Sequence, residues 1–251
     1  VSGRKGASGF SFDLMTFNVL GSQHTSPSGG RPAFAPGRVR SEWGKGLIER
    51  RGASLVGLSE PQPDQINQFN IATRGAWTFF PGTTQGYDAA PQSVMWKDSD
   101  WEYVWADTAQ LPFMRKSRPQ PVVRLRHRAS GREIYMINAH LSPGKMQADR
   151  DKGLAIIVQL IRLLRDDNLP IIVTGDLNEH GLAFRKIACE TFLNAAVGGK
   201  SRGGQCELPR HMRVDWIFGG RGSFSDTAVD ISSRVRRTTD HAVISSTFTV
   251  E

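Results

Sequence analysis

The sequence has little cysteine and no long apolar run. Its two cysteines, Cys189 and Cys206, belong to no Cys-x-x-Cys pair and to no histidine ligand pattern, which argues against a zinc site. No stretch of about 18 consecutive apolar residues occurs, so no transmembrane helix is predicted. Internal repeats, long low-complexity linkers and an apolar targeting segment are also absent. We therefore expect a single domain over residues 10–251, preceded by a flexible basic tail at residues 1–9.

The charge is strongly positive, although the remaining composition is ordinary. Of the 251 residues, 39% are hydrophobic and 22% are charged, and the net charge is +8 with a pI of about 9.9. Such a balance favours contact with the phosphates of nucleic acid, anionic lipid or a phosphorylated small molecule. A merely solubilising surface is the alternative.

The pattern of apolar residues predicts many strands and few helices. The expected strands are 10–20, 54–60, 91–97, 101–107, 121–128, 132–141, 170–178, 213–220 and 241–250. The expected helices are 38–52, 63–75, 145–167 and 181–196. Because no helix is expected between residues 91 and 141, a parallel doubly wound sheet is excluded, and the pattern favours an α/β sandwich of mixed sheets.

A buried strand that ends in polar residues gives the first indication of function. Ile171 to Thr174 are apolar or β-branched, and Gly175, Asp176, Leu177 and Asn178 follow at once. Asp176 and Asn178 are two residues apart and are expected to point the same way. Taken alone, the segment is equally consistent with an ordinary turn after a strand.

Similar polar side chains recur at the ends of the other expected strands. Since strands that converge in a sheet bring their ends together, these side chains are expected to share one cleft, where they must satisfy each other or a ligand. The set is Asn18, Glu60, Asn138, His140, Asp176, Asn178, Asp215, Asp240 and His241.

This set has the chemistry that phosphoester hydrolysis needs. The carboxylates of Glu60, Asp176 and Asp240 suit Mg²⁺ or Mn²⁺ rather than zinc. A metal ion would polarise a phosphoryl oxygen and acidify a bound water, and the histidines would add general acid–base catalysis of about 10²–10⁴-fold. The amides of Asn18 and Asn178 can bind phosphate oxygens or hold the attacking water.

The same residues lie in motifs that resemble the markers of the endonuclease/exonuclease/phosphatase superfamily, whose fold is deoxyribonuclease I-like. The motifs are TFNVLG, GLSEPQ, NAHL, GDLN, VDWIF and TDH, in the order of the family, from Asn18 to His241. The resemblance implies a four-layer α-β-β-α sandwich with two mixed central β-sheets flanked by helices. It also implies metal-dependent cleavage of a phosphoester by in-line attack of water.

The resemblance further implies a metal site with Mg²⁺ (or Mn²⁺) as cofactor. Glu60 would be the main ligand, helped by Asn18 and Asp240. Asp176 and Asn178 would bind and orient the water and the phosphate.

Acid–base and phosphate-binding roles follow from the same resemblance. His241, held by Asp215, is expected to be the general base, and His140 the general acid or a phosphate stabiliser. Asp176 is the rival base. Asn138 and Arg118 are expected to contact the substrate phosphate.

The substrate stays open at this stage. Ser59 and Thr239 stand where the family motifs more often have Gln and Ser, and the residues after GDLN lack the Tyr-Arg of inositol polyphosphate phosphatases. No abasic-site endonuclease signature lies between the NAHL and GDLN motifs. A nuclease-type phosphodiesterase is the leading hypothesis. A sphingomyelinase-like lipid phosphodiesterase or a phosphatase is the alternative, and an inactive binding module is the least favoured.

Two surface features bear on that choice. Trp101, Tyr103 and Trp105 are expected on one strand face, either as a core strand or as a membrane-contacting hairpin. Arginines that could contact nucleic acid are Arg124, Arg126 and Arg128 on one strand face, and residues 202, 210, 213, 234, 236 and 237. With nucleic acid as the preferred partner, we expect a monomer.

The two cysteines are 17 residues apart and could be free thiols or close one loop. Because some secreted members of the resembling family bridge this region, we predict a disulfide between Cys189 and Cys206. A disulfide fits an exported protein, and a cytoplasmic one is the alternative.

Overall fold

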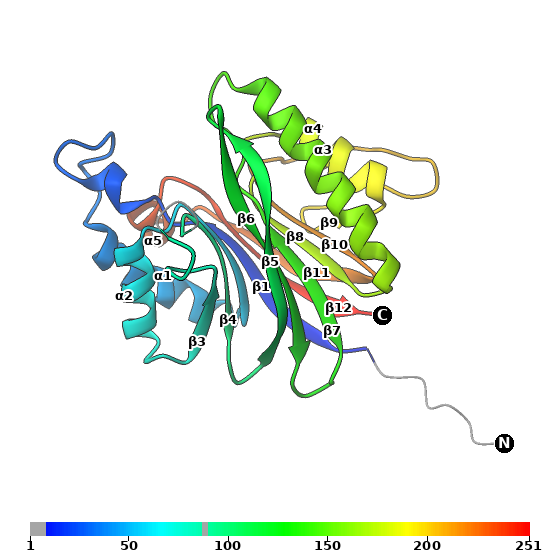
Figure 1. Ribbon diagram of the computed structural model, residues 1–251, viewed down its shortest axis with the longest axis horizontal. Coiled ribbons are helices and arrows are strands. Elements are labelled where there is room, and N and C mark those ends of the chain that lie inside the picture. The colour runs from blue at the N-terminus through cyan, green and yellow to red at the C-terminus, as the bar shows by residue number, and fades with distance from the viewer. Residues whose placement is uncertain (1–8, 87–89) are drawn as a thin grey trace.

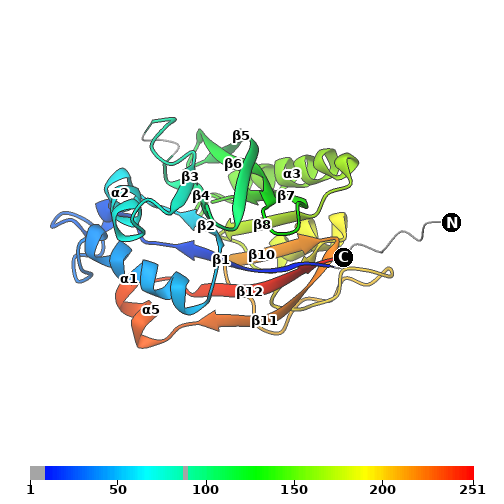
Figure 2. The same cartoon turned by 90° about the horizontal axis from the view of Figure 1, so that it is seen from below.

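Two six-stranded mixed sheets pack face to face between layers of helices in the computed structural model, which describes residues 9–86 and 90–251 (Figures 1 and 2). The predicted α-β-β-α sandwich is thus confirmed. Apart from Gly9, the predicted tail lies outside the described residues. No helix in the described ranges is both long and apolar enough to cross a membrane.

The first sheet has the strand order β11-β12-β1-β2-β4-β3, in which only β1 and β2 are parallel neighbours. Its strands are β1 (Ser11–Asn18), β2 (Leu55–Ser59), β3 (Trp77–Phe80), β4 (Gln92–Lys97), β11 (Gly222–Asp230) and β12 (Val243–Val250). The second sheet has the order β5-β6-β7-β8-β10-β9, in which only β7 and β8 are parallel. Its strands are β5 (Trp101–Phe113), β6 (Lys116–His127), β7 (Glu133–Asn138), β8 (Ile171–Asp176), β9 (Asn194–Ala195) and β10 (Asp215–Gly220).

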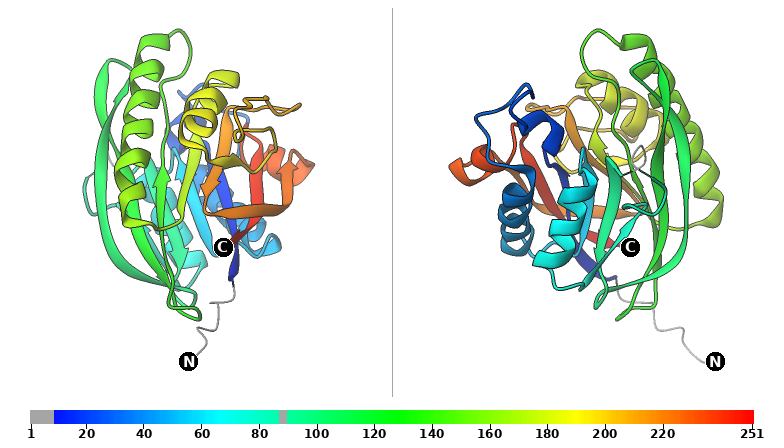
Figure 3. Two further views of the ribbon diagram at one scale, coloured as in Figure 1. Left: turned by 90° about the vertical axis from the view of Figure 1, so that its right-hand side faces the viewer. Right: turned by 60° about the vertical axis from the view of Figure 1, so that its left-hand side comes forward.

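Helices cover the outer face of each sheet, as Figure 3 shows from two sides. The first sheet carries α1 (Gly37–Arg50), α2 (Pro63–Ala72) and α5 (Ser233–Thr238). The second carries α3 (Gln147–Leu164) and α4 (Gly181–Ala183), which continues as a π-helical turn at Phe184–Cys189. Short 3₁₀ turns lie at Ser22–Thr25 and Arg165–Asp167.

Strand alternation explains how the layers are held together. In β7, Ile134 and Met136 belong to the apolar cluster between the sheets, whereas Tyr135 and Ile137 belong to the cluster under α3. Both faces of this central strand are buried, and the sequence accordingly has no exposed polar face there.

The longest hairpin differs from its prediction in the length of its strands and in the faces of its aromatic side chains. The strands β5 and β6 are longer than expected, and a bulge at Val104 shifts their pairing between Tyr103 and Trp105. Trp101 is therefore buried between the sheets while Trp105 stands opposite Arg124. The expectation that the three aromatic residues share one face is wrong, although Tyr103 (55% exposed) and Trp105 (42%) are both accessible.

Other expectations fail at the edges of the fold. The helix expected over 181–196 ends near Cys189, and β9 follows it. The strands β3 and β11 and the short helix α5 were not expected. β11 is mostly exposed and rich in Gly, Ser and Asp, so it lacks the apolar alternation by which strands are recognised.

The predicted Cys189–Cys206 disulfide is present, with a Cα–Cα distance of 5.6 Å. It closes a 17-residue loop, which in the chain-entropy model stabilises the fold by about 3 kcal/mol. We expect no free thiol by thiol titration of the native, non-reduced protein. The double variant Cys189→Ala/Cys206→Ala should lower the free energy of unfolding by about that amount in denaturant titrations, and two reactive thiols in the native protein would contradict the bridge.

Candidate active site

The ends of five strands bring the predicted polar residues to one end of the sandwich. Asn18 and Asp176 are the last residues of β1 and β8, and Glu60 follows β2 directly. Asp215 begins β10, and His241 precedes β12 by two residues. A cavity of about 480 Å³ opens there, and its lining includes Glu60, Arg118, His140, Asp176, Asn178, Asp240 and His241.

Three residues near the cavity have a positive φ, a backbone conformation that is strained for residues other than glycine. Gly175 has φ +142°, and a Cβ there would lie 1.7 Å from the carbonyl oxygen of Ala139, so only glycine fits before Asp176. Glu60 (φ 67°) and Asn178 (φ 48°) are non-glycine residues in the left-handed region. Such strain, of order 1–3 kcal/mol per residue, is typical of functional sites.

Asn18 connects the two carboxylates nearest to the cavity. Its Nδ2 lies 3.0 Å from Glu60 Oε1 and 3.0 Å from Asp176 Oδ2, and its Oδ1 accepts a hydrogen bond from the backbone N–H of Leu20. A metal ion would need the amide oxygen, which is directed away from the carboxylates. The structure therefore places Asn18 as a donor that positions Glu60 and Asp176, which differs from its predicted role as a ligand.

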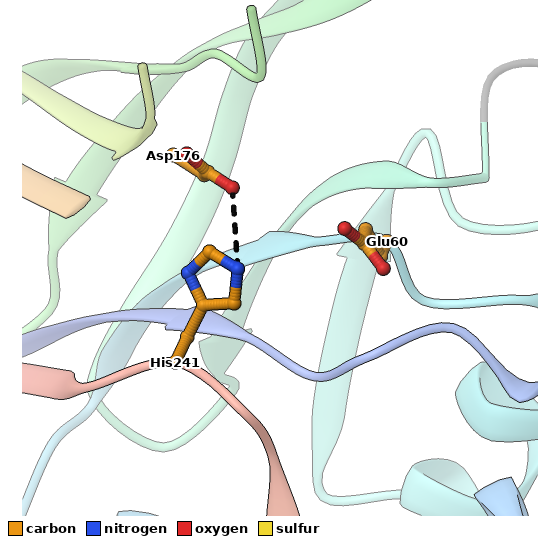
Figure 4. Close-up of side chains that lie close together, drawn as sticks. All are labelled: Glu60, Asp176 and His241. Atoms are coloured by element: carbon orange, nitrogen blue, oxygen red, sulfur yellow. Dashed lines mark ion pairs between the residues drawn. The ribbon is translucent and has the colours of Figure 1, made fainter. Parts of the chain in front are cut away.

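His241 lies between two aspartates. Its Nδ1 donates to Asp215 Oδ2 at 2.9 Å, and its Nε2 lies 3.6 Å from Asp176 Oδ2 (Figure 4). Burial lowers the pKa of His241, but the hydrogen bond and charge of Asp215, with a smaller contribution from Asp176, raise it to about 10. His241 is thus an imidazolium at neutral pH in the metal-free protein.

His140 is the second imidazole of the site, on the other side of Asp176. Its Nε2 lies 3.5 Å from Asp176 Oδ2, and its Nδ1 has no hydrogen-bond partner among the described residues. The ring stands edge-on to Phe113. Burial lowers the pKa of His140, so this imidazole is neutral where His241 is charged.

The carboxylates respond to the same burial in different ways. Burial raises the pKa of Asp176 and of Asp215 above the ordinary value. Burial opposes ionisation of Glu60 as well, but hydrogen bonds from Asn18 and from the backbone N–H of Gly21 favour its ionised form, and the pKa of Glu60 lies below its usual range. Glu60 is therefore the most readily ionised of the three buried carboxyl groups.

The side chains of Glu60, Asp176 and His241 converge on one point, where the two carboxylates could hold a cation. In the described part of the chain, one ligand atom from each lies within 4.8 Å of the others. Two carboxylates that converge in this way offer the hard oxygens that Mg²⁺ and Mn²⁺ prefer. Asp240, the predicted third ligand, lines the same cavity but pairs with Arg31 at 3.1 Å.

Asn138 does not reach the cavity. Its Nδ2 donates to the carbonyls of Leu58 (2.8 Å) and Ser93 (3.3 Å), and its Oδ1 accepts from Thr174 Oγ1 at 2.9 Å. The side chain is fully buried and joins the two sheets. The prediction that Asn138 contacts substrate phosphate is wrong, because β7 ends at this residue and its face still points between the sheets.

Asn178 and Arg118 do line the cavity, as predicted. Asn178 donates to the carbonyl of Leu141, which leaves its Oδ1 for the cavity. The guanidinium of Arg118 lies 3.8 Å from the ring centre of Phe113, the residue that also supports His140. Arg118 is therefore held at the rim by stacking as well as by charge.

Two residues of the site were missed in the sequence. His24 Nε2 lies 3.4 Å from Glu60 Oε2, and Arg31 bonds Asp240, so the loop at residues 22–36 covers one side of the cavity. Both stand in a Pro/Gly/Ser-rich segment without periodicity. No local signal marks them, because their contacts depend on how that loop folds back.

A proton on His241 should be directly observable. We expect its imidazole signals, in NMR spectra of the metal-free protein, to titrate near pH 10, while those of His140 titrate below 6.5. Since the folded pKa of His241 exceeds the ordinary 6.5, its protonation stabilises the fold fully below pH 6.5 and less as pH rises toward 10. Asp215→Asn should lower the His241 midpoint, and a wild-type midpoint near 6.5 would refute the ion pair.

Comparisons with known proteins identify the fold. No protein-family model matches the sequence, and no curated protein matches it. Solved structures do match over nearly the whole chain. An endonuclease/exonuclease/phosphatase family protein from Bacteroides thetaiotaomicron is 13% identical, with a TM-score of 0.74, over 97% of this chain and 99% of that one.

Two further similar structures belong to proteins with more specific names. The human Nocturnin catalytic domain with bound sulfate is 18% identical, with a TM-score of 0.72, over 95% of this chain and 94% of that one. The mannosyl-6-phosphatase of B. thetaiotaomicron VPI-5482 is 14% identical, with a TM-score of 0.72, over 94% and 98%. The resemblance to the superfamily is therefore confirmed at the level of the fold.

Proposed function

We propose, from an endonuclease/exonuclease/phosphatase fold with a full complement of polar residues at its cleft, that this protein is a metal-dependent phosphoester hydrolase and most specifically a phosphodiesterase. One observation carries the proposal: Glu60, Asp176 and His241 converge within 4.8 Å at the ends of strands from both sheets. A structural role alone would not favour two carboxylates at this distance in a buried site.

Glu60 and Asp176 would hold Mg²⁺ or Mn²⁺, with Asp240 beside them. When bound, the ion would polarise the phosphoryl oxygen and lower the pKa of a coordinated water. Glu60 suits the main ligand position, because its pKa is held low and it remains ionised at neutral pH.

His241 and Asp176 would divide the proton transfers. With a pKa of about 10, His241 carries a proton at neutral pH, so we assign to it stabilisation of the phosphoryl charge and donation of a proton to the leaving oxygen. Asp176, the rival base, would accept the proton of the attacking water as the new P–O bond forms and the ester P–O bond breaks. This reverses the expected role of His241 as base.

The remaining side chains would orient the substrate. Arg118, in β6, and Asn178, just after β8, both line the cavity and would contact phosphoryl oxygens. The neutral His140 would donate or accept one hydrogen bond beside them. Nucleic acid is our preferred substrate, and the disulfide supports export.

A phosphoester panel tests the proposal. The protein should hydrolyse a phosphodiester in Mg²⁺ or Mn²⁺ when offered plasmid, oligonucleotide, sphingomyelin, a sugar phosphate and inositol phosphates. Cleavage of sphingomyelin alone would favour the lipid alternative and draw attention to Tyr103 and Trp105. Hydrolysis of none of them with either metal would contradict the proposal.

A further inference from the structure

Two more cavities continue from the candidate active site along one side of the molecule. The first, of about 350 Å³, shares Asp240 and His241 with the active-site cavity and extends to Arg213 and Arg236. The second, of about 550 Å³, shares Arg213 and extends to Arg210. Because each cavity shares lining residues with the next, the three together make up one groove, whose lining includes Arg236 of α5 and Val229 of β11.

The arginines of this groove are not neutralised. Over residues 9–86 and 90–251, no carboxylate lies within 4.0 Å of Arg210, Arg213 or Arg236, and all three are exposed. The only acidic residue that lines either of the two cavities is Asp240, which already pairs with Arg31. The groove therefore presents exposed positive charge that leads away from His241, although the charge of Arg213 also acts on Asp215, where it opposes the rise in the pKa of that carboxyl.

The arginines on the opposite side of the molecule behave differently. Arg124 and Arg126 bond Glu133 at 2.6 and 2.7 Å, and Arg126 also bonds Glu102 at 3.2 Å. Arg128 donates to the backbone carbonyl of Asp98. The cationic strand face expected in β6 is thus largely engaged within the protein, since two of its arginines form ion pairs and the third bonds the backbone.

Apolar side chains alternate with these cations. Ile231 (43% exposed) and Val229 (41%) line successive cavities, together with Phe34 and Met212. A duplex would present mainly phosphates to such a surface, whereas a single strand also offers the faces of its sugars and bases. Single-strand binding grooves combine positive charge with aromatic side chains on which bases stack, and Phe34 is an aromatic side chain in the lining of this groove.

We propose that this groove binds the strand of a single-stranded nucleic acid on one side of the scissile phosphate, with Arg236, Arg213 and Arg210 contacting successive phosphates away from His241. The inference rests on the proposed function for the position of the scissile phosphate. It adds that the substrate is a polymer, that it is unpaired, and that it leaves the cleft toward α5 rather than toward the β5–β6 hairpin.

Binding can be measured without catalysis. With a 5′-fluorescent 12-nucleotide single strand in EDTA, fluorescence anisotropy should show Arg210→Ala/Arg236→Ala to bind roughly tenfold or more weakly at low salt. The slope of log affinity against log salt should become shallower by about 1.4, that is, about 0.7 for each lost contact. The matched control Arg128→Ala/Arg162→Ala removes the same charge from exposed sites outside the groove and should change neither quantity.

The outcomes separate this inference from the proposed function. Equal losses of affinity in the groove and control variants, or an unchanged slope of log affinity against log salt, would contradict the proposal that the groove binds the strand. Retention of oligonucleotide binding by the groove variant together with loss of binding to phosphatidylglycerol vesicles would replace nucleic acid by a membrane surface. If the binding results are as expected but neither the wild type nor any variant hydrolyses a phosphoester with Mg²⁺ or Mn²⁺, the proposed function is wrong, whereas the proposal that the groove binds a single strand is retained.

Discussion

Replacement of Glu60 by Gln is expected to reduce kcat/KM for phosphodiester hydrolysis by about 10³-fold, or about 4 kcal/mol of transition-state stabilisation. The change keeps the size of the side chain and removes only its charge. Asn18 Nδ2 and the backbone N–H of Gly21 bond different oxygens of Glu60, so the single amide oxygen of Gln can keep one of these two hydrogen bonds. The loss should therefore come from weaker metal binding and not from unfolding.

A metal titration and a matched control make this result specific. The metal concentration for half-maximal rate should rise in Glu60→Gln, while the thermal midpoint stays close to that of the wild type. Glu190→Gln removes the same charge from an exposed site that pairs with Lys186, and it should leave the rate unchanged. Wild-type activity in Glu60→Gln would show that Glu60 is not a metal ligand.

His241→Ala and Asp215→Asn are expected to lower kcat by about 10²–10⁴-fold each, and the double variant should lose no more than the more damaging single one. The reason is geometric, since Asp215 acts on the reaction only through the 2.9 Å hydrogen bond that holds the His241 ring and its proton. Residues that act as one unit give non-additive losses in a double-mutant cycle.

The cycle needs a fold check, because Asp215 is buried. Near-UV circular dichroism of each variant should match the wild type. Losses that multiply in the double variant would mean that Asp215 contributes separately from His241. In that case the hydrogen bond from His241 to Asp215 would not account for the role of Asp215 in the reaction.

Most of the site could be predicted because strand ends are recognisable in the sequence. Asp176 follows an apolar run, and it lies on the face of β8 that points between the sheets, at their open end. Asn138 follows a similar run in β7, yet its amide is used between the sheets. In the sequence both are polar residues at the end of a strand. They differ only in the fold, where Asn138 bonds backbone carbonyls of the opposite sheet and Asp176 lines the cavity.

The orientation of side chains and the irregularities of the backbone could not be predicted from the sequence. Which atom of Asn18 faces the carboxylates depends on the N–H of Leu20, two residues later and in the left-handed region. The bulge at Val104, which moves Trp105 to the other face, leaves no mark in an alternating pattern. The contact of His24 with Glu60 depends on the path of an aperiodic loop.

Metal dependence of the wild-type rate can be measured by depletion and reconstitution. Protein depleted of metal with EDTA and then dialysed is expected to hydrolyse its best phosphodiester at a background rate. Added Mg²⁺ or Mn²⁺ should restore the rate in wild type but not in Glu60→Gln at the same concentration. A full rate in the depleted protein, or equal restoration in wild type and Glu60→Gln, would contradict this metal dependence.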